Sequence, residues 1–154
     1  MLNKKSEPLL IIQARCNSSR LPGKIFLKLS GFEIWYLLYK RLSLKFNKIV
    51  FAIPENITND LLFQKLKNKK IKVFRGSENN VVLRFINTLE HFQSNHFIRV
   101  CADNPYTCYK ELSRLVNIYS KNSLDYCYNN SPYGNNYPDG FGAEISSLKI
   151  LKKI

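Results

Sequence analysis

Residues 9–24, LLIIQARCNSSRLPGK, carry four apolar residues directly into a polar loop. A short continuous apolar run predicts a strand buried on both faces of a sheet, and the change at Gln13 marks its carboxyl end. The loop contains the guanidinium groups of Arg15 and Arg20, two serine hydroxyls and the ammonium group of Lys24. Such groups suit phosphate oxygens, and open α/β sheets bind ligands at this end of their strands. The stretch therefore predicts a polyphosphate site; from charge alone, the alternative is an ordinary solvated surface loop.

Beyond this stretch the chain alternates between short apolar runs and amphipathic segments. Further strands are predicted at residues 48–53, 71–74, 96–101 and 124–128, and helices at about 34–44, 58–66, 80–92 and 111–119. Strands separated by helical segments of this length form right-handed βαβ units. The sequence therefore predicts an α/β fold, a three-layer α/β/α sandwich around a mainly parallel sheet. Residues 129–142, rich in Asn, Gly and Pro, predict a substrate-facing loop.

Composition limits the classes of protein to which the chain can belong. Its 154 residues, 45% of them hydrophobic, suffice for a single domain with one core. A net charge of +13 raises nucleic acid as a partner, but the lysines are scattered instead of forming a stripe, so this is the weaker hypothesis. The sequence lacks an apolar run long enough for a membrane span or a signal peptide, which predicts a cytoplasmic protein. Its four cysteines lack a CxxC pair and are expected to be free thiols.

The opening stretch resembles the N-terminal signature of sugar nucleotidyltransferases, in particular the cytidylyltransferases of the spore coat polysaccharide and acylneuraminate type. Those enzymes begin in a similar way, with a strand, Gln-Ala-Arg, a small polar pair and Arg-Leu-Pro-Gly-Lys. The resemblance implies that the loop binds the nucleotide CTP and that Arg15 and Lys24 also take part in catalysis. The nucleotide-binding residues implied are Gln13, Ala14, Arg15, Ser19, Arg20, Gly23 and Lys24.

Asp103 follows the predicted strand at residues 96–101, within Ala-Asp-Asn-Pro. A carboxylate at the carboxyl end of a strand is well placed to hold Mg²⁺ against a nucleotide, although Asp before Asn-Pro also favours a simple turn or a helix cap. The cytidylyltransferases carry a similar Ala-Asp-x-Pro with the aspartate as metal ligand. The resemblance therefore implies that Asp103 is catalytic and binds Mg²⁺.

Two further segments resemble the same family. Residues 74–84, FRGSENNVVLR, are similar to a segment that lines the nucleotide site, which implies nucleotide contacts for Arg75 and Ser77; the alternative for Ser77 is a helix cap. Residues 137–144, YPDGFGAE, resemble a segment that faces the sugar, which implies sugar binding by Asp139 and Glu144. The alternative is a Pro-Asp-Gly turn that leads into a strand.

The resemblance implies a Rossmann-like fold of the nucleotide-diphospho-sugar transferase type and a defined reaction. A hydroxyl of an acidic sugar attacks the α-phosphorus of CTP in line and displaces pyrophosphate, in surface polysaccharide or glycan biosynthesis. CTP and the acidic sugar are the expected partners, and a homodimer is a further expectation. The same family continues beyond the length of this chain, so residues 1–154 are expected to form a single domain that lacks the family's C-terminal part.

The chain departs from the family pattern at four positions where the family has a carboxylate. These positions are Asn79, Asn80, Cys108 and Gly142. A magnesium site needs enough oxygen ligands and negative charge to hold the ion. The departures therefore keep open a second hypothesis, that the domain binds a nucleotide without catalysing its transfer. The third hypothesis is the basic nucleic-acid-binding protein that the net charge suggests.

Overall fold

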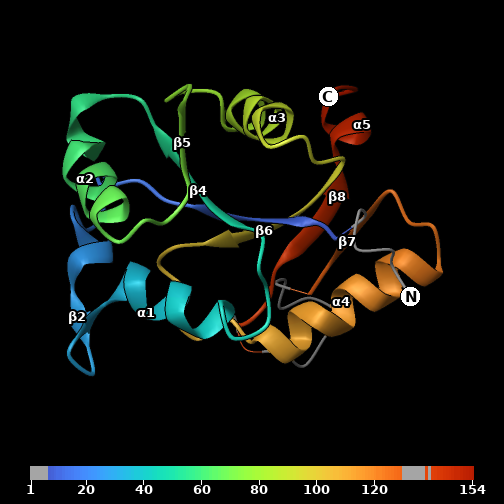
Figure 1. Cartoon of the computed structure of the whole chain (residues 1–154), viewed down its shortest axis with the longest axis horizontal. Helices are drawn as coiled ribbons and strands as arrows, with labels where there is room; N and C mark the ends of the chain where they lie inside the picture. Colours follow the sequence, from blue (N-terminus) through green and yellow to red (C-terminus); the bar gives the residue numbers. More distant parts are fainter. Residues whose placement is uncertain (1–6, 130–137, 139) are drawn as a thin grey trace.

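A six-stranded sheet forms the centre of the structure, a computed structural model that describes residues 7–129, 138 and 140–154. The strands lie in the order β5-β4-β1-β6-β8-β7 (Figure 1). Their bounds are β1 Leu9–Gln13, β4 Ile49–Pro54, β5 Val73–Gly76, β6 His96–Cys101, β7 Tyr126–Tyr128 and β8 Glu144–Ser147. The first four in spatial order pair in parallel, whereas β8 pairs antiparallel with both β6 and β7.

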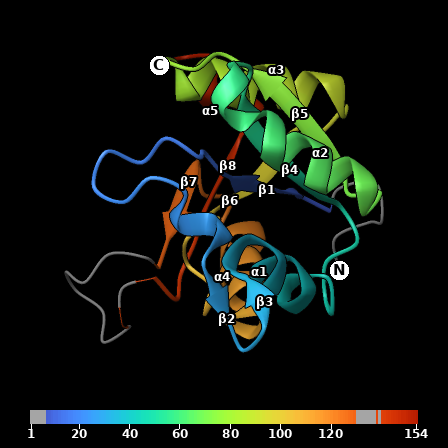
Figure 2. The ribbon, with the colours of Figure 1, turned by 90° about the vertical axis from the view of Figure 1, so that its left-hand side faces the viewer.

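Helices cover both faces of the sheet, which confirms the predicted three-layer sandwich. In Figures 1 and 2, α3 (Val81–His91) and α5 (Leu148–Leu151) lie on one face, and α1 (Ile34–Leu42) and α4 (Tyr109–Lys121) lie on the other. The remaining helix α2 (Asp60–Asn68) lies beside the β5 edge and shares its core with α1 and α4. None of the helices within the described residues combines the length and the apolar character that crossing a membrane requires.

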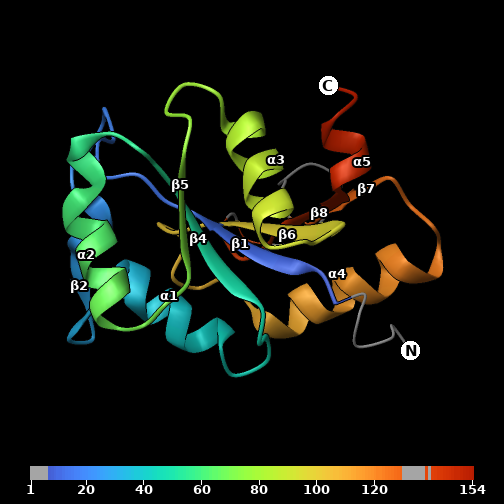
Figure 3. The same cartoon turned by 45° about the horizontal axis from the view of Figure 1, so that its top comes forward.

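The apolar run of β1 is buried because each of its faces meets a different layer. Leu9 and Ile11 pack in the core beneath α3, whereas Leu10 and Ile12 pack in the core shared with α1 and α4. Successive side chains of a strand point to opposite faces, so a strand in the middle of a sandwich must be apolar throughout. Figure 3 shows β1 lying between β4 and β6, with α3 above the sheet. The sequence expectation for this strand is confirmed.

One strand of the sheet was expected only under the alternative interpretation of residues 137–144, a turn that leads into a strand. The crossover through α4 places β7 parallel to β6, as a right-handed βαβ unit requires, but leaves room for one strand between them. That position is filled by β8, which returns antiparallel and pairs Glu144 with Arg99 of β6. The fifth predicted strand, residues 124–128, is therefore the edge strand β7. The prediction of a mainly parallel sheet is confirmed, because among the described strands of this sheet β8 alone runs antiparallel to the others.

A small hairpin between the opening loop and α1 was also missed. It joins β2 (Lys28–Leu29) and β3 (Phe32–Glu33) through Ser30 and Gly31, both of which have positive φ, 51° and 81°. Two consecutive residues with positive φ form the tight turn that suits the twist of a hairpin. Strands of two residues are too short for hydrophobic alternation to reveal them.

Candidate functional site

The opening loop, residues 14–24, is held in place at both ends. Gly23 has a φ of 70°, a conformation that L residues with a side chain rarely adopt, and its N–H donates to the carbonyl oxygen of Cys16 at 2.8 Å. The N–H of Cys16 in turn donates to the side-chain oxygen of Asn59 at 3.0 Å. Because Asn59 is fully buried before α2, the loop is anchored to the connection between β4 and α2. The sequence analysis predicted Gly23 in this loop but not its anchor.

Lys24 and Asp103, assigned to the site from separate segments, meet in an ion pair. Lys24 begins the short 3-10 helix at Lys24–Phe26, and Asp103 follows the carboxyl end of β6. Both side chains are about one-third exposed. The pair therefore joins the opening loop to the carboxyl edge of the sheet, which is where open α/β sheets bind their ligands.

The other basic groups of the loop face solvent. Arg15, Ser19 and Arg20 are exposed, whereas Ala14 is buried and contributes to the core under the loop. Neither guanidinium is in an ion pair with a carboxylate of the part of the chain that the structure describes. The loop therefore presents two unneutralised positive charges beside the single neutralised charge of Lys24, an arrangement that attracts an anion.

Arg75 binds within the protein. Its Nη2 donates to the carbonyl oxygens of Glu55 and Asn56 at 2.8 and 2.9 Å and forms an ion pair with Asp60 at 2.7 Å. The guanidinium also lies over the ring of Phe63, 5.1 Å from its centroid. These contacts fix the chain after β4 against β5, so Arg75 has a structural role, and its contact with a nucleotide stays a prediction.

Ser77 takes part in the start of α3, as the alternative interpretation expected. Its hydroxyl oxygen accepts from the N–H of Asn80 at 3.1 Å, and the side-chain oxygen of Asn80 accepts from the N–H of Leu83 at 2.8 Å. Asn and Asp cap a helix about equally well, so Asn80 keeps the cap and loses only the charge. Next to Ser77, Glu78 accepts from the amide of Asn17 at 3.1 Å. This contact brings the segment after β5 against the opening loop, and the nucleotide contact of Ser77 stays a prediction.

A second group of polar side chains, the sheet cluster, lies where β1, β6, β7 and β8 run side by side. It consists of Gln13, Arg99, Tyr126 and Glu144. The Nε of Arg99 donates to the side-chain oxygen of Gln13 at 2.8 Å, and its Nη1 donates to Glu144 at 2.6 Å. The structure thus links a predicted nucleotide residue, Gln13, to a predicted sugar residue, Glu144, through Arg99. Asp139, the other predicted sugar residue, lies outside the described residues.

The charges of the sheet cluster stabilise one another. Burial, the largest single influence, would lower the pKa of Arg99, but the charge of Glu144 and its hydrogen bond, together with Cys101 and Tyr126, outweigh it and raise the pKa. Partial burial, together with the charge of Glu144 and a hydrogen bond to it, raises the pKa of Tyr126 to about 12. At neutral pH the cluster therefore contains a paired guanidinium and carboxylate and a neutral phenol that donates to the carboxylate.

A cavity of about 550 Å³ opens beside this cluster. One wall is polar and contains Gln13, Arg99, Tyr126 and Glu144. The other is apolar and comes mainly from α3, α5 and β6, with Val81, Phe85, Phe97 and Leu151 among its residues. A mostly apolar hollow with a few convergent polar groups is the usual form of a small-molecule site.

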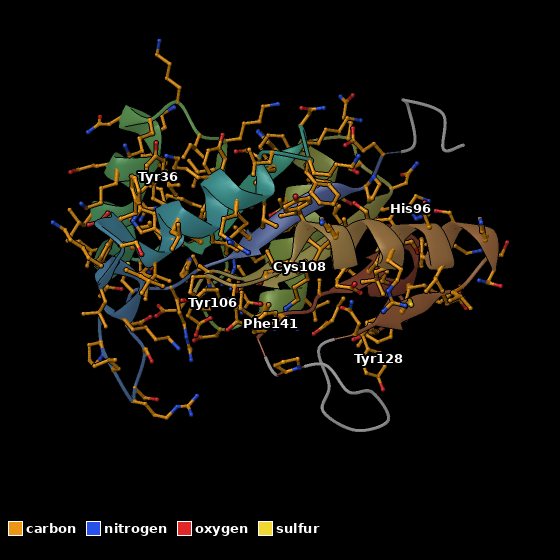
Figure 4. All side chains as sticks on the ribbon, turned by 90° about the horizontal axis from the view of Figure 1, so that it is seen from below. Tyr36, His96, Tyr106, Cys108, Tyr128 and Phe141 are labelled. Carbon is orange, nitrogen blue, oxygen red and sulfur yellow. The ribbon has the colours of Figure 1, made fainter. Side chains whose placement is uncertain are left out.

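The loop that carries Asp103 packs against the segment before β8. Cys108 N–H donates to the carbonyl oxygen of Phe141 at 3.0 Å, and the rings of Tyr106 and Phe141 stack with centroids 6.1 Å apart. Figure 4 shows these residues together at one end of α4, with His96 near its other end. Cys108 is the N-cap residue of α4 but makes no side-chain capping bond.

The structure also explains the glycine at position 142. A Cβ atom there would overlap the backbone carbonyl oxygen of Asn129, because this segment pairs closely with the end of β7. The next residue, Ala143, donates its N–H to the side-chain oxygen of Asn129 at 2.8 Å. The missing carboxylate at Gly142 therefore follows from a close backbone approach that admits no side chain.

The described part of the chain offers few oxygen ligands for Mg²⁺. Within residues 7–129, 138 and 140–154, no three acidic, histidine or cysteine side chains gather as a metal site. Mg²⁺ commonly keeps several waters and binds through one or two carboxylates together with substrate phosphates. Asp103, partly exposed beside the opening loop, fits a site of this shared kind and does not fit a site made by protein ligands alone.

The segments that carry these side chains match a known protein family. A family model described as cytidylyltransferase matches residues 9–136, which include the opening loop, the segment after β5 and Asp103. The chain belongs to the cytidylyltransferase family. The resemblance in the opening stretch is thereby confirmed, while Glu144 lies beyond the matched range.

Two curated proteins are related to this cytidylyltransferase chain. SpsF, the spore coat polysaccharide biosynthesis protein of Bacillus subtilis, is 33% identical over 133 residues, which are 82% of this chain and 55% of SpsF. The uncharacterised protein MJ1063 of Methanocaldococcus jannaschii is 31% identical over 145 residues, 93% of this chain and 58% of that protein. The chain therefore spans a little more than half the length of these relatives.

Solved structures show the same cytidylyltransferase fold. A cytidylyltransferase from Leptospira borgpetersenii has a TM-score of 0.87 and 28% identity, with 94% of this chain and 62% of that chain covered. The CMP:2-keto-3-deoxy-manno-octonic acid synthetase, solved with CTP, has a TM-score of 0.72 and 15% identity over 96% of this chain and 77% of that chain. The second likeness concerns the fold alone. The predicted Rossmann-like nucleotidyltransferase fold is confirmed.

Sequence reasoning missed Arg99, the residue that connects the sheet cluster. The residue stands in the middle of an otherwise apolar strand, HFIRVC, at a position that the sheet largely buries. A charge at a buried strand position needs a partner, and this requirement was the available signal. The partners, Gln13 and Glu144, are 86 and 45 residues distant in sequence, so only the fold identifies them.

Proposed function

We propose that this chain transfers a cytidylyl group from CTP to a hydroxyl of an acidic sugar, with release of pyrophosphate, in polysaccharide or glycan synthesis. The ion pair between Lys24 and Asp103 carries the proposal, because it joins the two family motifs at the ligand-binding edge of the sheet. Membership of the cytidylyltransferase family supports the nucleotide. The acceptor oxygen would attack the α-phosphorus in line, which breaks the bond to the departing pyrophosphate.

The opening loop would bind the triphosphate. Arg15 and Arg20 are exposed and unneutralised, and Lys24 lies at the sheet edge, so the three cations can neutralise the charge that accumulates on the phosphate oxygens. Asp103 would hold Mg²⁺ together with phosphate oxygens, and the ion would supply further charge neutralisation when bound. In this proposal Asp103 would hold the metal, and Lys24, its ion-pair partner in this structure, would bind the phosphates.

The sheet cluster and its cavity would receive the sugar. Glu144 and Gln13 offer hydrogen-bond acceptors and donors for hydroxyl groups, and Arg99 offers a guanidinium for an acidic group of the sugar. The cluster lies on β1, β6 and β8, so the acceptor would approach the nucleotide from the sheet face. Association of two chains into a homodimer stays a prediction, which sedimentation of the purified protein tests.

The first experiment is a calorimetric titration of CTP, UTP, ATP and GTP into the purified protein, with and without Mg²⁺. Tight, Mg²⁺-dependent binding of CTP alone is the expected result. A pyrophosphate-release assay with CTP and a panel of acidic and neutral sugars then tests the transfer. Equal binding of all four nucleotides would contradict the preference for CTP, and release with neutral sugars alone would contradict the acidic acceptor.

A second candidate function is nucleotide binding without catalysis. It is favoured by the asparagine, cysteine and glycine at Asn79, Cys108 and Gly142, where the family pattern has carboxylates. This candidate expects CTP to bind as above and no pyrophosphate to appear with any sugar. Clear Mg²⁺-dependent turnover would exclude it.

A further inference from the structure

Arg84 is a charged residue in the buried stripe of α3. Its side chain is 2% exposed, and it shares the inner face of the helix with Phe85, Thr88 and Leu89. Arginine is almost never fully buried unless it is paired, because removing a guanidinium from water is costly. The position of Arg84 therefore requires an explanation: the residue ends the family-like segment 74–84, but the sequence analysis gave it no role, and it does not belong to the sheet cluster.

The guanidinium is fixed against the segment after β5. Nη1 donates to the carbonyl oxygen of Ser77 at 2.5 Å, so the side chain reaches back over the start of its own helix. Gly76 makes room for it, because a Cβ there would lie 3.2 Å from Cγ of Arg84 and 3.0 Å from the ring of Phe74. Nε of Arg84 is buried and has no hydrogen-bond partner among the described atoms.

Within the described residues, no carboxylate lies at ion-pair distance from Arg84, unlike Arg75 and Arg99, which each have one. Burial lowers the pKa of Arg84, and the positive charge of Arg15 lowers it further, while Glu78 acts in the opposite direction. The segment that Arg84 holds also contacts the opening loop, since Nη1 of Arg84 donates to Ser77 and the adjacent Glu78 accepts from the amide of Asn17 at 3.1 Å. Glu78 supplies negative charge to this region but forms no ion pair with Arg84, and the loop above carries the unpaired Arg15, so the region favours the binding of an anion.

A purely structural explanation is that Arg84 braces the segment after β5 through its bond to Ser77. That role needs one N–H donor and not a buried, unneutralised charge, and it gives no reason for placing the charge near Arg15. A neutral or smaller donor could serve it at lower cost in desolvation. The charge itself indicates a ligand.

We propose that Arg84 acts with Arg15 as an anion-binding residue for the nucleotide, and that the polyphosphate supplies the counter-anion that the buried guanidinium lacks in the free protein. The inference deepens the proposed function and rests on it for the identity of the nucleotide. Arg84 acts from beneath the opening loop, mainly through its field and the position of the Ser77 segment, so it is a positioning residue. Its effect should depend on the phosphates and not on the base or ribose.

The test compares three ligands with wild-type protein, Arg84→Met, Arg84→Lys and the control Arg114→Met, which removes an exposed guanidinium from α4. Calorimetry with CTP, with cytidine and with inorganic tripolyphosphate measures the affinities. We expect Arg84→Met to weaken the binding of CTP and tripolyphosphate by about 10- to 100-fold, because it removes a positive charge from beneath the opening loop. Cytidine binding should change less than about twofold, Arg84→Lys should recover part of the loss, and the control should match wild type.

The outcomes separate this inference from the proposed function. Equal weakening of CTP and cytidine would make Arg84 a brace only, and unchanged CTP affinity would remove its role; both overturn the inference. If wild type binds tripolyphosphate in an Arg84-dependent way but does not bind CTP, the anion site stands and the proposed function fails. If wild type binds neither, both fail. Circular dichroism confirms the fold of each variant, and Arg84→Lys supplies the same comparison should Arg84→Met not fold.

Discussion

The opening loop and the sheet cluster balance their charges in different ways. In the loop only Lys24 is paired with a carboxylate, and Arg15 and Arg20 face solvent without one. In the cluster the one guanidinium, Arg99, is paired with Glu144 and bonded to Gln13. A region with unpaired cations needs an anion to complete it, whereas a region with internal pairs is oriented before any ligand arrives. The difference predicts that charge changes in the loop affect nucleotide binding, and those in the cluster affect the acceptor.

The largest effect is expected at the junction of Lys24 and Asp103. Lys24→Ala and Asp103→Asn should each lower the rate of pyrophosphate release by about 100- to 1,000-fold, because each removes a group that stabilises charge in the transition state. Asp103→Asn should also abolish the Mg²⁺ dependence of CTP binding. Lys152→Ala, which breaks an exposed ion pair with Glu90, is the control and should retain wild-type rates. Unchanged rates in the Lys24 and Asp103 variants would contradict the catalytic assignment.

Next in size is the effect of replacing Gly142, which precedes Glu144 of the sheet cluster by two residues. Gly142→Asp restores the carboxylate of the family pattern, but its Cβ would overlap the Asn129 carbonyl oxygen. Overpacking of this kind should lower the free energy of unfolding by about 3 kcal/mol, measured by urea denaturation. Asn80→Asp restores another carboxylate at a helix cap and should change stability by less than about 0.5 kcal/mol. Equal stability of the two variants would show that the segment before β8 can move aside.

A smaller effect is expected from Glu144→Gln, which breaks the internal pair of the cluster. CTP affinity should stay within about twofold of wild type, while pyrophosphate release in the presence of the sugar should fall about tenfold. Without the carboxylate, the pKa of Tyr126 should fall from about 12 toward its ordinary value. Because a raised pKa favours the protonated phenol in the folded state, wild type should lose this stabilisation as the pH rises from about 10 to about 12.

An ultraviolet titration of the phenols, compared with Tyr126→Phe, measures this pKa. Glu111→Gln, which affects a helical pair with Arg114, is the matched control for removal of a carboxylate. A Glu144→Gln variant that loses CTP affinity as strongly as Lys24→Ala would break the distinction between the two regions.

The smallest effect is expected at Cys108, the uncapped N-terminus of α4 beside the Asp103 loop. Cys108→Asp and Cys108→Ser should each raise the free energy of unfolding by about 0.5 to 1 kcal/mol, since both side chains can accept from the first turn. If Cys108→Asp raises the Mg²⁺ affinity and Cys108→Ser does not, the added carboxylate lies close enough to Asp103 to share the proposed metal. That result would sharpen the contrast between a loop region that binds the nucleotide and a sheet cluster that binds the acceptor. Denaturation and Mg²⁺ titration of both variants provide the measurements.

The fold was predictable where one short segment contains the whole signal. The apolar run of β1 and the stripes of α3 and α4 identify buried elements by themselves, and the family signature identified the loop. The strand β8 entered only as the alternative for residues 137–144, and its place between β6 and β7 was not predicted, because EISS is short and that place depends on the space left by the α4 crossover. The links from Arg99 to Gln13 and Glu144 were likewise hidden, since they join residues from three strands.

A loop at a strand end can be predicted as a ligand site from the side chains that it carries. A contact between side chains on neighbouring strands depends on the strand order and register, which the sequence of one segment does not contain. This is why the sequence located Lys24 and Asp103 but missed Arg99 and Arg84. Both missed residues are charges at positions where the period of the element predicts burial. A charged residue in a buried stripe is therefore a signal that sequence analysis can use before a structure is known.

The position of β8 also determines the order in which the molecule can be built. In the chain β7 precedes β8, but in the sheet β8 lies between β6 and β7, so β7 has no strand to pair with until Glu144–Ser147 has been synthesised. The opening loop depends on β1, the chain before α2 and Asp103, all of which leave the ribosome earlier. A growing chain thus completes the region proposed for the nucleotide before the region proposed for the acceptor, and in the folded protein β7 should be the first strand to exchange its amide hydrogens.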